Sequence, residues 1–218
     1  LFELGEPTAG NTVLVPAAAG SVGSVVCQLA ALEGCKVIAV AGGAAEVDYL
    51  RSELGIETVL DWQSVDFADA LGAAGHAAGG IDVFIDLVGG AIHDQVMRHI
   101  NIGARVALVG YISAYNAEGE PENYGDIYAV LFRRATVRGF FAPDFAPKAP
   151  VIRARLGELL RRGELRYHEE VTEGFERLPE AFASLFSGFR PGKKLVRAGR
   201  DDGEAVGAAP APETPHGA

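Results

Sequence analysis

The sequence predicts a doubly wound α/β fold, in which helices cover both faces of a parallel sheet. Short apolar runs alternate with helix-like segments, and glycines follow the carboxyl ends of those runs. A turn of small residues also joins the first apolar run to an apolar helix. This alternation is typical of a parallel sheet that is buried on both faces and has right-handed crossovers.

The first half of the chain supplies three of the expected strands. Residues 12–15 form a short apolar run, and the apolar residues 22–30 after it fit a helix. Residues 36–41 are a second strand of the buried type, ended by two glycines and followed by a helix through residue 54. Residues 58–61 are a short third strand.

The second half continues the alternation. A helix from about residue 66 to 74 precedes a fourth strand, residues 81–86, which runs into paired glycines. A helix around residues 92–100 leads to a fifth strand at 104–110, and a further strand fits residues 135–141. Because ligands of doubly wound sheets bind at the carboxyl ends of the strands, the glycine turns predict a binding site at that edge.

The turn after the first strand has the character of a phosphate-binding loop. The N–H groups of Ser21 and Val22 are expected at the start of a helix, where its dipole and unpaired donors favour an anion. Gly20 would let the backbone approach a pyrophosphate, and Gly23 would let helix and strand pack closely. Ala18 stands where the usual fingerprint has its first glycine, so an ordinary strand–turn–helix remains an alternative.

Composition limits the class of protein. The 218 residues are 49% apolar, enough for a substantial core, and the formal net charge of −10 disfavours nucleic acid as a partner. Neither a membrane span nor a signal peptide is visible, so we expect no membrane partner and a cytoplasmic location. Cys27 and Cys35 are expected to be two buried thiols rather than a disulfide.

The polar residues do not predict a metal site or a hydrolase triad. The five histidines are scattered, and the two cysteines lack the spacing of paired metal ligands. His93 and His99 are interpreted as surface residues of a helix. Asp86 ends the fourth strand, where it fits two roles equally well: reaching the cofactor crevice, or capping the helix that follows Gly90.

The two ends of the chain differ from its centre. Residues 1–7 have the pattern of the last turn of an amphipathic helix, ended by proline and glycine. Residues 200–218 are rich in acidic residues, proline and glycine and almost devoid of large apolar side chains. Such a segment cannot bury enough surface to order itself, so we expect a disordered tail.

Several motifs together resemble one family. The chain is similar to the cofactor half of the zinc-independent medium-chain reductases, and most of all to the leukotriene B4 12-hydroxydehydrogenase / prostaglandin reductase / 2-alkenal reductase group. The segments that carry the resemblance are residues 17–23, 40–44, 86–90, 110–116, 137–141, 169–175 and 179–182.

The resemblance extends over roughly residues 1–198 and implies a domain organisation. Family members have a GroES-like domain before this region, so the resemblance implies that the chain is a fragment without that domain. Residues 1–164 are then a Rossmann dinucleotide-binding domain, residues 165–199 a segment that returns to the absent domain, and residues 200–218 the tail.

The resemblance also implies the residues that contact the cofactor. The first turn holds the pyrophosphate, the loop from Gly110 lines the nicotinamide ribose, and Phe140 and Phe141 pass near the nicotinamide ring. Tyr115 is the implied catalytic residue, since a phenol beside the reacting oxygen can stabilise a developing enolate; its alternative is a packed loop tyrosine. The implied cofactor-binding residues are Gly20, Ser21, Val22, Gly23, Gly43, Glu46, Trp62, Gly110, Tyr111, Ile112, Ser113, Tyr115, Phe140, Phe141 and Arg190.

The chain departs from the family pattern at four polar positions. Glu46 replaces a lysine beside the adenosine 2′-phosphate, Trp62 a tyrosine, and Leu87 and Arg190 two asparagines. The charge of Glu46 favours NAD(H), although Arg51 lies close enough along the helix to compensate. The family pattern nevertheless favours NADP(H), by a narrow margin, and no zinc.

These observations predict an NAD(P)H-dependent oxidoreductase that reduces the C=C bond of an α,β-unsaturated ketone or aldehyde. A quinone reductase of the same superfamily and a non-catalytic nucleotide-binding remnant are the alternatives. The expected partners are a small enone or quinone substrate and, through the edge strand at residues 136–141, a second copy of the chain.

Overall fold

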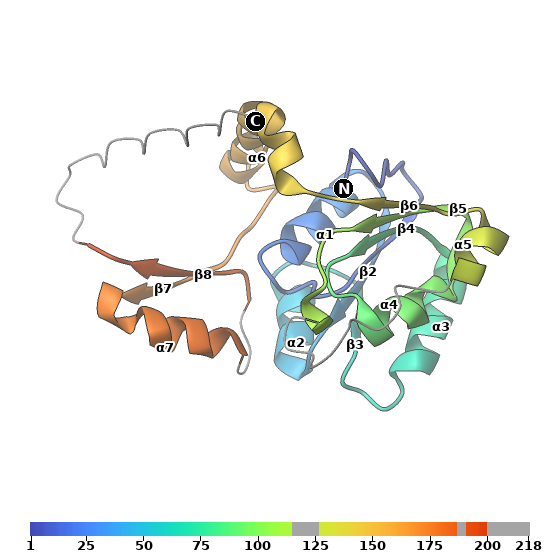
Figure 1. Cartoon of the computed structure of the whole chain (residues 1–218), viewed down its shortest axis with the longest axis horizontal. Coiled ribbons are helices and arrows are strands. Elements are labelled where there is room, and N and C mark those ends of the chain that lie inside the picture. The colour runs from blue at the N-terminus through green and yellow to red at the C-terminus, as the bar shows by residue number, and fades with distance from the viewer. Residues whose placement is uncertain (115–126, 187–190, 200–218) are drawn as a thin grey trace, which may run out of the picture.

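A six-stranded parallel sheet forms the centre of the computed structural model, which describes residues 1–114, 127–186 and 191–199 (Figure 1). Its strand order is β3-β2-β1-β4-β5-β6, which reverses between β1 and β4. The strands are β1 (Thr12–Val15), β2 (Lys36–Ala41), β3 (Thr58–Asp61), β4 (Ile81–Asp86), β5 (Ile100–Leu108) and β6 (Thr136–Gly139). The doubly wound α/β fold predicted from the sequence is confirmed.

Helices connect the strands and cover both faces of the sheet (Figure 1). They are α1 (Gly23–Leu32), α2 (Ala44–Ser52), α3 (Phe67–Ala78), α4 (Gly90–Met97) and α5 (Ile127–Arg133). Within the ranges that the structure describes, none of the helices is both long and apolar enough to cross a membrane.

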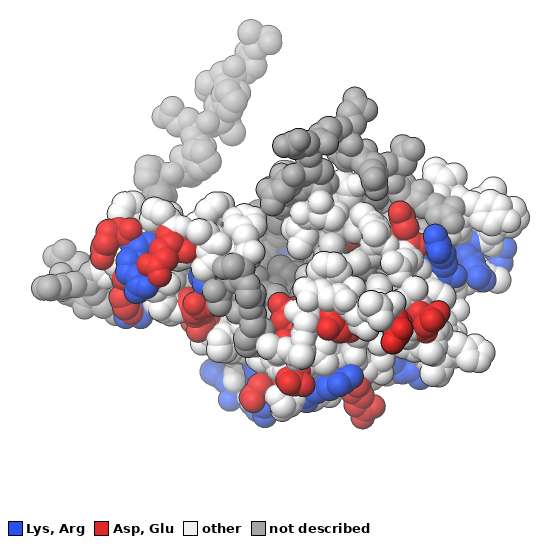
Figure 2. Space-filling view, turned by 90° about the horizontal axis from the view of Figure 1, so that it is seen from below, with Lys and Arg blue, Asp and Glu red and all other residues white. Residues whose placement is uncertain are grey.

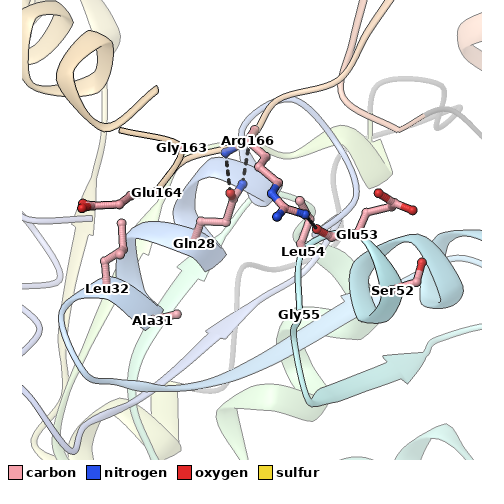
Figure 3. A pocket seen from close by; sticks show the side chains of 10 residues that line it. All are labelled: Gln28, Ala31, Leu32, Ser52, Glu53, Leu54, Gly55, Gly163, Glu164 and Arg166. Carbon is pink, nitrogen blue, oxygen red and sulfur yellow. Dashed lines mark hydrogen bonds between the residues drawn. The ribbon is translucent and has the colours of Figure 1, made fainter. Parts of the chain in front are cut away.

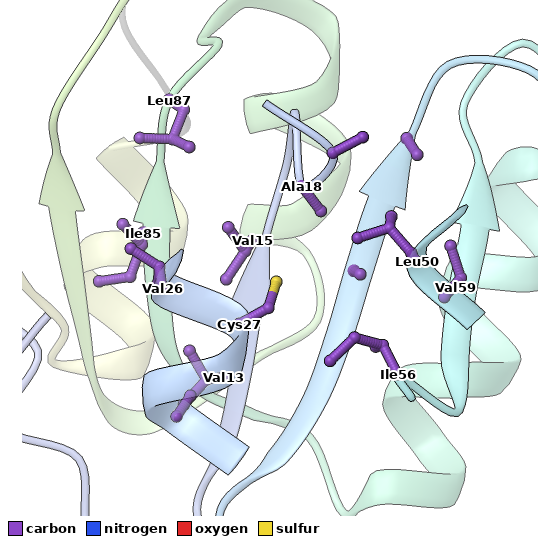
Figure 4. Packing of buried hydrophobic residues seen from close by; sticks show 14 of the residues in the cluster. Val13, Val15, Ala18, Val26, Cys27, Leu50, Ile56, Val59, Ile85 and Leu87 are labelled. Atoms are coloured by element: carbon purple, nitrogen blue, oxygen red, sulfur yellow. The ribbon is translucent and has the colours of Figure 1, made fainter. Parts of the chain in front are cut away.

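The core consists of two apolar clusters, one on each face of the sheet. The first joins β1 to α1 and α2 through residues such as Val15, Cys27 and Leu50 (Figure 4). The second contains Leu14 of the same strand together with side chains of α3 and α4, such as Met97 of α4. Successive side chains of a strand point to opposite faces, so a run of apolar residues in β1 supplies both clusters.

The fifth strand begins four residues earlier than the sequence predicts. Ile100 was expected to end a helix, but α4 stops at Met97 and Ile100 pairs with Ile81 of β4. The strand continues through Gly103, which has a φ of +77°, and its register shifts there relative to β4. An irregularity that only glycine accommodates readily therefore lies inside the strand instead of before it.

The first residues form one helical turn that packs on the sheet. The Gly5 amide donates to the carbonyl oxygen of Leu1 over 2.8 Å, and Leu4 is buried in the cluster that covers α1 and α2. The ring of Phe2 lies 4.5 Å from the guanidinium carbon of Arg155, a cation–π contact. The expected helical turn with one apolar face is therefore present.

The C-terminal part of the described chain adds a second, smaller sheet. Strands β7 (Glu169–Glu173) and β8 (Lys193–Arg197) pair in parallel, next to α7 (Leu178–Ala183) (Figure 1). The remaining elements are η1 (Ile112–Ala114), η2 (Ala142–Lys148), α6 (Ala149–Arg161), η3 (Phe175–Arg177) and η4 (Ser184–Phe186). The boundary expected at residue 165 stays a prediction, and the expected tail at 200–218 lies outside the described residues.

Hydrogen bonds tie the segments that flank this second sheet to the main sheet and its helices. The buried Gln28 side chain of α1 bonds both backbone groups of Arg166, accepting from its N–H over 2.7 Å and donating to its C=O over 2.9 Å (Figure 3). Further along the chain, the Gly192 amide donates to the carbonyl oxygen of Ala19, in the turn that precedes α1. The second contact brings β8 next to the predicted phosphate-binding turn.

Acidic and basic side chains gather in different regions of the face shown in Figure 2. On the face in Figure 2, acidic side chains lie across the middle and basic ones gather mainly near the rim. The described residues on this face form no broad basic surface.

The two thiols differ in burial, which leads to a labelling prediction. Cys27 is fully buried, and its burial raises the pKa of the thiol to about 12. Cys35 was expected to be buried, but it precedes β2 and is only partly covered. Because the thiolate is the reactive form, we expect a thiol reagent at pH 8 to modify Cys35 alone in the folded chain and both cysteines in guanidinium.

Mass spectrometry of the labelled chain identifies the modified site. In a Cys35→Ser variant, the folded chain should take up no label and the unfolded chain one equivalent. Equal labelling rates for the two cysteines in the folded chain would contradict the burial of Cys27.

Candidate functional site

The turn between β1 and α1 leaves a row of backbone donors at the start of the helix. Within the described residues, the N–H groups of Ser21, Val22 and Gly23 have no hydrogen-bond acceptor. Val22 is the N-cap residue, and no side chain caps the helix there. Ser21 and Val22 are exposed and Gly23 is buried, so the first two donors and the positive end of the α1 dipole face solvent. This geometry suits an anion such as a pyrophosphate.

Gly23 and Ala18 explain how the turn is built without the full glycine fingerprint. A Cβ at Gly23 would lie 2.7 Å from the Cα of Ala18, so only glycine allows the helix to pack this closely on the turn. The Ala18 methyl is fully buried, and the Ala18 amide donates to the carbonyl oxygen of Val40 in β2 over 3.0 Å. Ala17 has a φ of +48°, which turns the chain at a position where glycine is common.

Carboxylates hold the loops at the ends of β2 and β3. Glu46 accepts a hydrogen bond from the Gly42 amide over 2.8 Å, and Asp61 accepts one from the Gly43 amide over 2.9 Å. Gly43 has a φ of +88°, which suits glycine. Sequence reasoning placed Glu46 and Gly43 at this site but not Asp61, whose position at the end of β3 was the available signal.

Trp62 lies beside the same loop. A Cβ at Gly42 would lie 2.9 Å from Nε1 of the Trp62 indole, so the ring lies directly against that glycine. The indole is nevertheless 48% exposed. A half-exposed aromatic face at the end of β3 offers a surface on which a flat base can stack.

Arg51 does not compensate for Glu46 in this structure. Its guanidinium donates to the carbonyl oxygen of Val59 in β3 over 3.0 Å, from the last turn of α2. Glu46 lies in the first turn of the same helix. The segments that follow β2 and β3, residues 42–49 and 61–66, contain acidic residues and no lysine or arginine.

The loops after β4 and β5 are hydrogen-bonded to each other, on the other side of the turn between β1 and α1. The Ser113 amide donates to the carbonyl oxygen of Val88 over 3.1 Å, and the Gly110 amide to that of Asp86 over 3.2 Å. A Cβ at Gly89 would overlap the Tyr111 ring, so the ring covers this glycine closely. The predicted site residues Gly110, Tyr111, Ile112 and Ser113 therefore lie together on the β4–β5 side of the strand reversal.

Phe140 and Phe141 follow β6 at the same edge of the sheet. The Phe140 amide donates to the carbonyl oxygen of Leu108 over 2.8 Å, and its ring stacks on Phe145 with 4.9 Å between centroids. Phe141 is 66% exposed. Two predicted site residues, Tyr115 and Arg190, lie outside the residues that the structure describes.

His93 is buried, which corrects the expectation of a surface residue. Its Nδ1 lies 2.8 Å from Oδ2 of Asp86, at the end of β4. Asp86 also accepts hydrogen bonds from the Val88 and Gly89 amides, so it holds the turn before α4. The sequence left two roles open for Asp86, and this contact is neither: no side chain caps α4, and the carboxylate is buried beneath the turn. Among the described residues, no group of three or more side chains could hold a metal ion.

A separate hollow of about 430 Å³ lies at the opposite end of the molecule (Figure 3). It is lined by the C-terminal ends of α1 and α2, including Leu32 and Ser52, and by the chain around Arg166. The C-terminal ends of these helices lead into the amino ends of the next strands. The hollow is therefore distinct from the loops at the carboxyl ends, where doubly wound folds bind ligands.

Comparison with known proteins agrees with this geometry. The family model described as "Zinc-binding dehydrogenase" matches residues 21–155, more than half of the chain. NADPH-dependent curcumin reductase of Escherichia coli is 34% identical over 207 residues, 93% of this chain and 59% of that protein. Prostaglandin reductase 1 of Rattus norvegicus is 36% identical over 193 residues, 87% of this chain and 57% of that protein.

A solved structure extends the comparison to the fold. The crystal structure of CurA from Vibrio vulnificus in complex with NADPH is 35% identical and superimposes with a TM-score of 0.85, over 92% of this chain and 60% of that one. The chain thus spans less than two thirds of the length of each of these proteins. The chain belongs to the zinc-binding dehydrogenase family of medium-chain dehydrogenases/reductases, and within it to the zinc-independent group that contains the prostaglandin and 2-alkenal reductases.

Proposed function

We propose that the chain binds NADP(H) and serves in the reduction of the C=C bond of α,β-unsaturated ketones or aldehydes. The observation that carries this proposal is the row of N–H groups at Ser21, Val22 and Gly23, which have no acceptor among the described residues, with Ser21 and Val22 exposed at the start of α1. The names of the relatives support it, since they include NADPH-dependent curcumin reductase and an NADP(+)-dependent 2-alkenal reductase of Nicotiana tabacum.

The residues around the turn fit a dinucleotide in one orientation. A pyrophosphate would be held at the start of α1, because the Gly23 position admits no side chain and no described residue accepts from the donors there. The adenosine would then lie along Gly42, Gly43 and Trp62, and the nicotinamide half along the loops after β4 and β5. When bound, the nicotinamide supplies the hydride.

The chain's own residues would position the reacting ring and shield it from water. We assign Tyr111, Ile112 and Ser113 to the ribose of the nicotinamide half, and Phe140 and Phe141 to the ring. Tyr115, the residue after η1, is proposed by resemblance to donate a hydrogen bond to the substrate oxygen. A donor aimed at an oxygen on which charge develops lowers the barrier.

The choice between NADP(H) and NAD(H) depends on Glu46. A carboxylate near the ribose repels a 2′-phosphate and can accept hydrogen bonds from a free 2′-hydroxyl. Here the Gly42 amide already bonds this carboxylate, which offsets part of its charge. We favour NADP(H), narrowly, because the relatives' names specify it.

Two other functions remain as competitors. A quinone reductase of the same superfamily would use the same cofactor site. A nucleotide-binding protein without catalysis is favoured by Glu46 and Leu87, which differ from the family pattern.

Titration of Trp62 fluorescence with NADPH and with NADH tests the proposal. We expect saturable quenching by both nucleotides, because the indole lies against Gly42, on the side that we assign to the adenosine. NADPH should bind more tightly than NADH. A Trp62→Phe variant should lose the signal while calorimetry still detects binding. Enone-dependent oxidation of NADPH then separates a reductase from a non-catalytic binder, and a folded chain that binds neither nucleotide would refute the proposal.

Substitution of Glu46 should change the cofactor preference. In Glu46→Lys, a cation replaces the carboxylate near the expected 2′-phosphate, so we expect the NADPH-to-NADH affinity ratio to rise by about tenfold, or ~1.4 kcal/mol. Glu46→Gln, which removes the charge but keeps an acceptor for the Gly42 amide, should give a smaller rise. Calorimetry of all three proteins measures the ratio, and an unchanged ratio in Glu46→Lys would place the 2′-phosphate elsewhere.

We also propose a homodimer through the edge strand β6. All four of its residues are exposed, and one side of the strand has no partner strand among the described residues. A charged residue on an edge strand opposes such pairing, so Val137→Lys should convert a dimer to a monomer. Sedimentation equilibrium measures the state, and Val171→Lys on β7, another exposed valine, is the matched control. A wild-type chain that is monomeric at high micromolar concentration would contradict this proposal.

A further inference from the structure

We propose that His93 is a positioning residue for the nicotinamide half of the cofactor, acting through Asp86. The inference rests on the proposed function, because it assigns a role within the proposed cofactor site. In this role, His93 orients the Asp86 carboxylate, which in turn holds the turn after β4 against the loop after β5.

The two side chains form a buried polar pair inside the protein. Asp86 is fully buried and His93 is 3% exposed, with 2.8 Å between His93 Nδ1 and Asp86 Oδ2. The imidazole also packs at 5.7 Å from the ring of Phe84, in the apolar cluster under α4. An ionised carboxylate can only accept, so we assign the ring proton to Nδ1.

The second carboxylate oxygen of Asp86 holds the turn itself. Oδ1 accepts from the Val88 amide over 3.0 Å and from the Gly89 amide over 2.9 Å. Gly89 and Gly90 both have positive φ, +71° and +59°, so the turn has a conformation that the local sequence alone holds weakly. His93 constrains the carboxylate from one side, and the two amides constrain it from the other.

The turn then contacts the loop that we assign to the nicotinamide ribose. The Val88 carbonyl accepts from the Ser113 amide, and the Tyr111 ring covers Gly89. The Asp86 carbonyl oxygen also accepts from the Val109 and Gly110 amides, at 2.8 and 3.2 Å. Both loops on this side of the strand reversal are therefore attached to one residue, whose side chain His93 orients.

Stability alone gives little reason for a polar pair at this position. Taking a carboxylate and an imidazole out of water costs free energy, and an apolar side chain of similar volume would pack in the cluster around Phe84. An apolar side chain could not, however, fix the direction of the Asp86 carboxylate. The pair is therefore explained better by the geometry it imposes on the loops than by net stabilisation.

The adenosine side provides an internal reference for the test. Its loops are held by Glu46 and Asp61, and neither carboxylate contacts His93 or Asp86 through a hydrogen bond given by the structure. Loss of the His93 contact should therefore weaken a ligand that reaches the β4–β5 side, and leave unchanged a ligand that occupies the adenosine side only.

The experiment compares NADPH with 2′,5′-ADP, which lacks the nicotinamide half, by calorimetry on the full chain. For His93→Leu we expect NADPH to bind about tenfold more weakly, the size of effect that loss of one charge-assisted hydrogen bond produces. The affinity for 2′,5′-ADP should equal that of the wild type. His93→Asn should restore NADPH binding, because its amide N–H can occupy the place of Nδ1. His76→Leu, on an exposed face of α3, is the matched control and should change neither affinity.

A second pair of variants serves if His93→Leu does not fold. In His93→Gln the amide nitrogen corresponds to Nε2 rather than Nδ1, so this variant should bind NADPH more weakly than His93→Asn. Equal NADPH affinities for the Asn and Gln variants would overturn the proposal, as would equal losses for NADPH and 2′,5′-ADP in His93→Leu. If the wild type binds neither ligand, the proposed function itself fails, a result that is distinct from normal wild-type binding with an unaffected His93 variant.

Discussion

The candidate site depends on the parallel pairing of six strands. Because each strand starts again from the same end of the sheet, every loop after a strand is brought to one edge, whatever its distance along the chain. The reversal of strand order between β1 and β4 separates the loops after β2 and β3 from those after β4 and β5. The turn before α1 lies between these two sets, and its N–H groups have no acceptor in the part of the chain that the structure describes.

The two sides of the site use carboxylates in the same way and with different consequences. Glu46 and Asp61 hold the partly exposed loops after β2 and β3, so their charge would lie near the ribose in the proposed binding mode. The Asp86 carboxylate is buried, and its hydrogen-bond partners are two backbone amides and the His93 ring. In the proposed binding mode, the first side would affect which nucleotide binds, and the second would affect how the nicotinamide half is held.

Sequence patterns predicted the sheet well and the polar contacts poorly. Apolar runs and glycine turns identified all six strands of the main sheet, because burial on both faces requires such runs. They misjudged the start of β5, where Gly103 lies inside the strand. His93 was expected at the surface because its spacing from His99 suggested no shared ligand. That spacing says nothing about Asp86, the carboxylate seven residues earlier with which His93 pairs.

The sequence by itself determined the fold class, the order of strands and helices along the chain, and the tight turn of small residues between β1 and α1. These features follow from local periodicity and from backbone conformations that favour glycine, both of which are written in neighbouring residues. Only the tertiary structure decided that Arg51 bonds Val59, that Cys35 is partly exposed, and that His93 pairs with Asp86. Such contacts depend on the direction in which side chains from different elements meet, and that direction is set by the packing of helices on the sheet.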